Sequence, residues 1–124
     1  MKKVDIIAYN TLSFNQSKIE VTPNQKVVVT FKDESTTLSH QWVLLNAGVD
    51  PGKFSRELMR AREGNGMGIP KALEKQIYAQ SPMLPPGGSA TVKFQAPAAS
   101  GAYTYVCACG LHYEGGMSGK LIVK

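Results

Sequence analysis

The sequence predicts an all-β domain, a Greek-key β-sandwich or barrel, with a helical insert around residues 51–80. Two observations lead to this prediction: short runs of alternating apolar residues occupy both ends of the chain, and turn-forming residues separate them at short intervals. A third is that residues 51–80 replace the two-residue period with good helix formers. A chain of 124 residues suits a single domain, residues 1–124, that buries its own core.

Seven segments are expected to be strands. In the segment beginning at Lys26, the apolar residues Val27, Val29 and Phe31 recur every two residues, as in a half-buried strand. The turn over residues 22–25 separates this segment from the one before it. The expected strands are Lys3–Ala8, Lys18–Val21, Lys26–Lys32, Gln41–Leu45, Ala90–Gln95, Tyr103–Cys107 and Gly119–Lys124.

The insert is expected to hold two helices, Lys53–Glu63 and Pro70–Gln80. In the first, Phe54 and Leu58 are four residues apart, which places them on one helical face. In the second, Leu73 and Ile77 have the same spacing, and a proline stands at a suitable first helical position. A helical segment of about thirty residues therefore joins two halves of a β domain.

The charge pattern excludes several classes of protein. The net charge is +5, and residues 51–80 hold six Lys/Arg against three acidic residues. This modest excess is not the dense basic stripe of a nucleic-acid-binding protein. No run approaches the ~18 apolar residues of a membrane helix, so no integral membrane segment is expected. The start Met1-Lys2-Lys3 resembles a signal peptide, but Asp5 and Asn10 interrupt the apolar run that should follow.

The chemistry-bearing stretch is Tyr103–Lys124. Within eleven residues it contains Cys107, Cys109, His112 and Met117, which are all soft or borderline metal ligands. Two cysteines one residue apart make a strained disulfide, whereas a thiolate and an imidazole on one short loop make a good copper or zinc site. The methionine thioether favours copper, since zinc sites use Cys, His and carboxylates.

A second histidine completes the pattern. The chain has only two, and His40 stands at the start of the expected strand Gln41–Leu45, beside the single Trp42. Two histidines, one cysteine and a weak axial methionine make a blue-copper electron-transfer site.

The chain resembles the small blue copper proteins, the cupredoxins. The resemblance is carried by His40-Gln-Trp-Val-Leu, a Tyr-x-Tyr-x-Cys strand, a Cys-x4-His-x4-Met loop and a final Gly-Lys-Leu-Ile-Val. Within the family it is most similar to auracyanin and azurin, and the similarity covers nearly the whole chain. The resemblance implies a cupredoxin fold, one bound copper ion and transfer of one electron between Cu(II) and Cu(I), with no enzymatic activity.

The resemblance also implies roles for individual residues. Ser39 stands where azurin has a glycine whose carbonyl approaches the metal, so the Ser39 carbonyl is a candidate extra contact. Gln41 replaces a family asparagine that hydrogen-bonds the cysteine sulfur. The implied copper ligands are His40, Cys107 and His112 in the equatorial plane and Met117 in the axial position.

Partners and location follow from the same resemblance. The expected partners are redox proteins such as a c-type cytochrome or an oxidase, and the expected state is a monomer. The expected location is periplasmic, or otherwise exported or membrane-facing. An apolar docking patch around His112 would contain Leu111, Tyr113, Gly115 and Gly116. The basic insert would steer acidic partners.

Cys109 keeps alternatives open. On a continuing strand it would point to the same side as Cys107, so both sulfurs would reach metal in a perturbed or dinuclear copper site. A zinc site or redox-sensing module built from Cys107, Cys109, His112 and His40 is a further alternative. A Cys–His nucleophilic enzyme is disfavoured because it would leave Met117 without a role. The Cys109→Ser variant separates these alternatives through its visible spectrum and redox couple.

Overall fold

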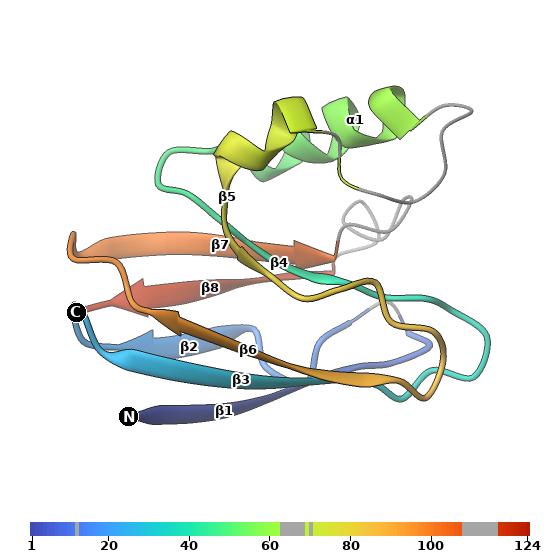
Figure 1. The fold of residues 1–124 in the computed structure, drawn as a ribbon, viewed down its shortest axis with the longest axis horizontal. Coiled ribbons are helices and arrows are strands. Elements are labelled where there is room, and N and C mark those ends of the chain that lie inside the picture. Colours follow the sequence, from blue (N-terminus) through green and yellow to red (C-terminus); the bar gives the residue numbers. More distant parts are fainter. Residues whose placement is uncertain (12, 63–68, 70, 108–116) are drawn as a thin grey trace.

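The described residues form two sheets that pack face to face. The structure, a computed structural model, describes residues 1–11, 13–62, 69, 71–107 and 117–124. One sheet has the order β1 (Lys2–Ala8), β3 (Lys26–Asp33) and β6 (Ser89–Gln95). The other has the order β2 (Lys18–Val21), β8 (Ser118–Val123), β7 (Gly101–Cys107), β4 (Trp42–Leu45) and β5 (Ile77–Gln80). The predicted β-sandwich is confirmed, and the described strands form two separate sheets rather than one closed barrel (Figure 1).

The main core lies between the sheets. Val27, Val29 and Phe31 of β3 are buried with exposures of 1% or less, as their two-residue period predicts. From β7, Tyr103, Tyr105 and Cys107 join the same buried cluster. The β7 strand therefore carries its final residue, Cys107, into the interior between the sheets.

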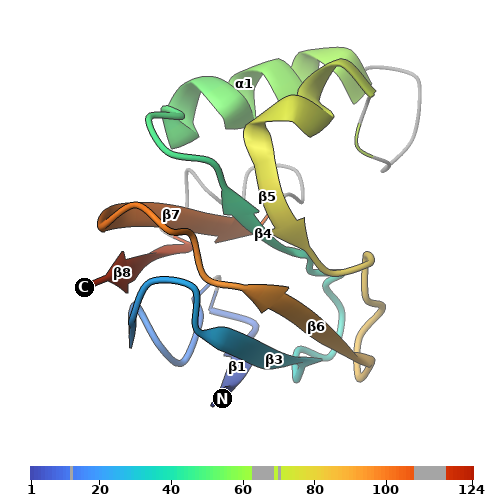
Figure 2. The ribbon, with the colours of Figure 1, turned by 60° about the vertical axis from the view of Figure 1, so that its left-hand side comes forward.

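The helical insert covers the outer face of the larger sheet. The helix α1 (Pro51–Arg62) and the 3₁₀ helix η1 (Lys71–Gln76) lie on the side away from β1, β3 and β6 (Figure 2). All four residues of β4 are buried because both of its faces are covered. The second cluster joins Val43 and Leu45 of β4 and Val106 of β7 to residues of the insert, namely Phe54, Leu58 and Leu73. A strand packed on both faces holds its ends rigidly.

The prediction of a second helix over Pro70–Gln80 is wrong in part. The 3₁₀ helix ends at Gln76, and residues 77–80 form β5, which pairs with β4 in antiparallel fashion. Ile77 and Tyr78 are β-branched and aromatic and so favour a strand where a sheet edge is available. The Tyr78 hydroxyl donates a hydrogen bond to the Gln95 carbonyl oxygen across to β6. The first predicted helix is confirmed over Pro51–Arg62.

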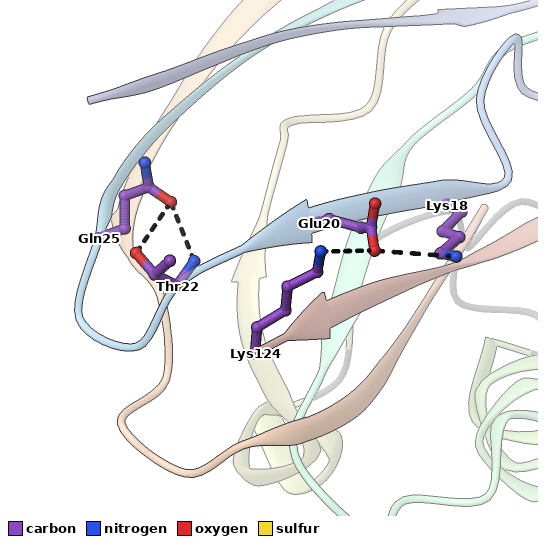
Figure 3. Close-up of polar contacts among 5 residues, drawn as sticks. All are labelled: Lys18, Glu20, Thr22, Gln25 and Lys124. Carbon is purple, nitrogen blue, oxygen red and sulfur yellow. Dashed lines mark hydrogen bonds and ion pairs between the residues drawn. The ribbon is translucent and has the colours of Figure 1, made fainter.

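An ion pair links Lys124, which follows β8, to Glu20 of β2. Glu20 pairs with Lys124 at 3.1 Å and with Lys18 at 3.8 Å, and Gln25 Oε1 accepts a hydrogen bond from the Thr22 N–H (Figure 3). The contact with Lys124 and the charges nearby lower the pKa of Glu20. These side chains are exposed, so the pairs contribute little stability. No helix among the described residues is long and apolar enough to span a membrane.

Candidate metal centre

His40 and Cys107 meet in the interior at one end of the sandwich. The strands β4 and β7 pair so that Trp42 lies opposite Cys107, which brings the residues just before β4 next to the end of β7. The His40 N–H donates to the Leu84 carbonyl oxygen at 3.0 Å, and the Leu84 N–H donates back to His40 at 2.8 Å. The His40 Nδ1 atom lies 3.5 Å from Cys107 Sγ.

This separation suits two ligands of a single metal ion. Metal–sulfur and metal–nitrogen bonds of about 2.3 and 2.0 Å, at a tetrahedral angle, place the two ligand atoms about 3.5 Å apart. His40 is fully buried and Cys107 is 2% exposed. Cys107 is a buried thiol of the kind that binds soft metals as a thiolate. The distance between the two donor atoms therefore suits both of them binding one metal ion.

Met117 lies beside this pair. The Cys107 N–H donates a hydrogen bond to the Met117 carbonyl oxygen at 3.3 Å, so the end of β7 and the residue before β8 are held together. The Met117 side chain is fully buried in the same cluster as Cys107. Imidazole, thiolate and thioether donors are thus gathered in one buried region, a set that suits copper better than zinc.

The remaining predicted site residues lie outside the described part of the chain. They are His112 and Cys109 of the expected site and Leu111, Tyr113, Gly115 and Gly116 of the expected docking patch. Within the described residues, no group of three or more His, Cys, Asp or Glu side chains is placed to hold a metal. Of the predicted His and Cys ligands, the described residues include His40 and Cys107. His112 stays a prediction as the third equatorial ligand.

The main chain hydrogen-bonds the cysteine sulfur. The Gln41 N–H points at Cys107 Sγ at 3.4 Å, while the Gln41 side-chain amide donates to the Ser81 carbonyl oxygen at 2.8 Å. A donor aimed at the sulfur stabilises its thiolate form. The side chain of Gln41 is longer than that of the asparagine it replaces, and it links the start of β4 to Ser81, the residue after β5, rather than to the sulfur. Ser39 is half-buried beside His40, and its role as a carbonyl contact stays a prediction.

The comparisons with known proteins agree with this geometry. Residues 2–124 match the family described as copper binding proteins, plastocyanin/azurin family. The chain belongs to this family. These cupredoxins are blue copper proteins that carry electrons, and the family binds one copper.

Individual relatives include auracyanins and an azurin. The chain is 32% identical to auracyanin-A of Chloroflexus aurantiacus over 114 residues, which is 91% of this chain and 68% of that protein. The dithionite-reduced auracyanin of Roseiflexus castenholzii has a TM-score of 0.88 and 33% identity, covering 100% of this chain and 98% of its own. An azurin of Methylomonas sp. strain J has a TM-score of 0.79 and 27% identity, and the match covers 99% of this chain and 98% of the azurin chain. The cupredoxin fold predicted from the motifs is confirmed.

The surroundings of His40 favour its charged form. Burial lowers the pKa of His40, but the hydrogen bond and charge of Cys107, the charge of Asp33 and the backbone of Tyr9 together raise it above the ordinary value. The contact of the imidazole through Nδ1 is with Cys107 Sγ, at 3.5 Å.

Aromatic side chains pack in the core next to Cys107, which lies opposite Trp42 in the β4–β7 pairing. The Trp42 ring stacks on Phe94 with centroids 6.0 Å apart and lies 5.6 Å from the Tyr105 ring. Trp42 and Tyr105 are fully buried. Such packing excludes water and lowers the dielectric next to Cys107.

Sequence reasoning missed two residues that hold the start of β4 and one buried acidic residue. Leu84 and Ser81 hold the residues before β4 through backbone contacts, and nothing in their local sequence announces this role. Asp33 is 1% exposed although it is ionisable. Here a signal existed, because Asp33 stands two residues after Phe31 in the inward period of β3.

Proposed function

We propose that the chain is a soluble one-electron carrier with a mononuclear type 1 copper held by His40, Cys107, His112 and Met117. The observation that carries the proposal is the buried pair of His40 Nδ1 and Cys107 Sγ, 3.5 Å apart, with Met117 beside it. Family membership supports the same assignment. For His112 the support is its spacing from Cys107 and Met117 in the sequence.

Bound copper supplies the change between Cu(II) and Cu(I) at this site. The protein's contribution is to keep the donor atoms in one arrangement for both states. His40 is held by the reciprocal hydrogen bonds with Leu84, and Cys107 by its pairing with Trp42 and its bond to Met117. Donors held in this way move little, which keeps the reorganisation cost of electron transfer low.

The Gln41 N–H and the buried environment tune the thiolate. The N–H hydrogen bond withdraws charge from Cys107 Sγ, and the aromatic packing around Trp42 excludes water. Met117 would supply a weak thioether ligand. The Gln41 N–H and the residues around Trp42 would influence which oxidation state the site prefers without binding the metal themselves.

One equivalent of Cu(II) added to the copper-free protein tests the proposal. The visible spectrum should show an intense blue band, and electron paramagnetic resonance should show a narrow copper hyperfine splitting. Cys107→Ser should abolish the blue band, and His112→Ala should broaden the hyperfine splitting. Cys109→Ser is the matched control and should keep the wild-type spectrum. A purple, red or green wild type, or retention of zinc with no charge-transfer band, would contradict the mononuclear type 1 assignment.

We also propose that the insert steers acidic redox proteins, such as a c-type cytochrome or an oxidase. Lys53, Arg56 and Arg60 are exposed on α1, whereas Lys32 and Lys93 lie in the opposite sheet. Raising the ionic strength should slow the second-order reaction with an acidic partner. Arg56→Gln combined with Arg60→Gln should slow it too, while Lys32→Gln combined with Lys93→Gln should not. A rate independent of salt would contradict steering.

The same resemblance supports an exported location and a monomer. Fractionation of the native cells should place the protein outside the cytoplasm, and light scattering of the purified protein should give the mass of a single chain. Recovery in the cytoplasmic fraction, or a mass of two chains, would contradict these expectations.

A further inference from the structure

Ser81 is a buried serine next to the proposed site that is not one of the proposed ligands. It follows β5 and is 2% exposed. Its N–H donates to the Trp42 carbonyl oxygen at 2.9 Å, and its carbonyl oxygen accepts a hydrogen bond from the Gln41 side-chain amide at 2.8 Å. Its hydroxyl accepts the Trp42 N–H at 3.0 Å and donates to the Pro82 carbonyl oxygen at 2.9 Å. The N–H, carbonyl and hydroxyl of Ser81 therefore all contact residues 41 and 42.

The Ser81 hydroxyl takes the place of a main-chain acceptor in the sheet. In the β4–β5 register Val43 lies opposite Gln80, so the next pair along is Trp42 and Ser81. Two residues that face each other in a hydrogen-bonded antiparallel pair exchange both of their N–H to carbonyl bonds. Here the Ser81 N–H bonds the Trp42 carbonyl oxygen as expected, but the Trp42 N–H goes to the Ser81 hydroxyl. This exchange leaves the Ser81 carbonyl oxygen for the Gln41 side chain.

The exchange lies next to the peptide group whose N–H points at the cysteine sulfur. That peptide group joins His40 to Gln41, and its N–H lies 3.4 Å from Cys107 Sγ. Its carbonyl oxygen accepts the Leu84 N–H at 2.8 Å, which holds the peptide group from the His40 side. On the other side, Ser81 binds the Gln41 side chain and the N–H of the following residue. The direction of the N–H toward the sulfur therefore depends on contacts on both sides of the peptide group.

Loss of the Ser81 hydroxyl would force this part of the sheet to rearrange. Trp42 is fully buried, so an N–H left without an acceptor there costs free energy. The Trp42 N–H would instead move to the carbonyl oxygen of residue 81, as in a regular ladder. That move displaces the Gln41 side-chain amide from the same oxygen. Residue 41 would then lose the contact that holds it on the side away from His40.

We propose that Ser81 is a positioning residue, whose hydroxyl replaces the last ladder acceptor between β4 and β5 and so keeps the Gln41 N–H directed at Cys107 Sγ. The inference rests on the proposed function and deepens it, because it names what holds the hydrogen bond to the copper-binding sulfur. A donor aimed at a thiolate withdraws charge from it and weakens its donation to copper. Weaker donation favours Cu(I), since a doubly charged ion gains more from a charged sulfur than a singly charged one.

The first test is the reduction potential of the copper-loaded Ser81→Ala variant. The balance between the oxidation states should shift at least about threefold toward Cu(II), which lowers the potential by about 28 mV. Ser81→Thr keeps a hydroxyl acceptor and should keep the wild-type potential. Ser55→Ala is the matched control, because Ser55 is also a buried serine but lies in α1, and its potential should stay within about 10 mV of wild type. A Ser81→Ala potential within about 10 mV of wild type, or a shift that Ser81→Thr shares, would overturn the inference.

The second test uses the copper-free protein and needs no redox activity. Amide hydrogen exchange, followed by nuclear magnetic resonance, compares the Gln41 N–H with the N–H of Val43, which is paired with strands on both sides. In Ser81→Ala, exchange at Gln41 should become at least about tenfold faster relative to Val43, because only the contacts of residue 41 are loosened. An overall loss of stability would speed both amides alike and leave their ratio unchanged. An unchanged ratio would therefore overturn the positioning role.

The two tests separate this inference from the proposed function. A blue, reversible wild type whose potential Ser81→Ala does not change would overturn the role of Ser81 alone. A wild type without a reversible copper couple would overturn the proposed function, and the exchange ratio would then decide whether Ser81 holds the Gln41 N–H. If Ser81→Ala does not fold, as judged by circular dichroism, Gln41→Met supplies a second variant. It removes the side-chain bond to the Ser81 carbonyl oxygen, keeps the main-chain N–H, and should show the same two changes.

Discussion

Among the glycines in the described part of the chain, Gly119 is the one where an added methyl group would meet the closest contacts. It lies in β8 directly opposite Tyr105 of β7, and the tyrosine ring covers it. A Cβ added at Gly119 would overlap the ring, with Cε1 only 2.6 Å away and Cζ and Oη also in contact. Gly119→Ala therefore requires the Tyr105 ring to move.

The ring has little room to move. Tyr105 is fully buried, its ring packs 5.5 Å from Phe14 and 5.6 Å from Trp42, and its hydroxyl donates to the Gln16 carbonyl oxygen at 2.6 Å. Overpacking of a core costs about 1–3 kcal/mol, and loss of a buried hydrogen bond costs about 1–3 kcal/mol. Replacing a strand glycine returns about 0.5–1 kcal/mol. The expected net loss in the free energy of unfolding is therefore about 1–5 kcal/mol.

Urea unfolding of the copper-free protein, followed by Trp42 fluorescence, measures this loss. Tyr105→Leu provides the control, because a shorter side chain leaves space for the new methyl group. The double variant should be more stable than the sum of the two single losses predicts, by more than about 0.5 kcal/mol. A Gly119→Ala loss below about 0.5 kcal/mol, or strict additivity with Tyr105→Leu, would refute the reasoning.

Three further predictions concern stability. Burial raises the pKa of Tyr105 to about 12, above its value in the unfolded chain. The free energy of unfolding should therefore be constant below about pH 10 and fall as the pH rises to about 12, by up to about 2.7 kcal/mol. The Tyr105→Phe variant should lack this pH dependence in alkaline unfolding. Phe54→Ala should lose about 3–5 kcal/mol in urea unfolding because Phe54 is fully buried between α1 and the larger sheet, and a loss below about 1 kcal/mol would contradict that packing. Glu20→Gln should leave the thermal midpoint unchanged, since its ion pairs are exposed, and a clear drop would show that they matter.

Periodicity predicted those parts of the fold in which one face is buried. The alternation in Lys26–Lys32 and in Tyr103–Cys107 has a simple physical cause, a strand with one face toward the core. The sequence pattern did not predict the strand β5. Its side chains are alternately half-buried and exposed at a sheet edge, and the spacing of its apolar residues also fits a helix. Only the available edge of β4 decides between the two.

In the candidate site, too, the identity of the residues was predictable from the sequence, whereas their contacts depend on long-range pairing. His40, Cys107 and Met117 were predictable because their side chains carry metal-binding chemistry and the spacing of a known family. Their approach depends on the register that sets Trp42 opposite Cys107, which no local pattern contains. The supporting contacts of Ser81 arise in the same way from long-range pairing.

The central claim is that the chain carries one electron on one copper ion. Film voltammetry of the copper-loaded protein, combined with a copper count per chain, tests it most directly. The account predicts one copper per chain and one reversible one-electron wave, with the blue colour lost on reduction and restored on reoxidation. Two copper ions per chain, or a single copper without a reversible wave, would contradict it.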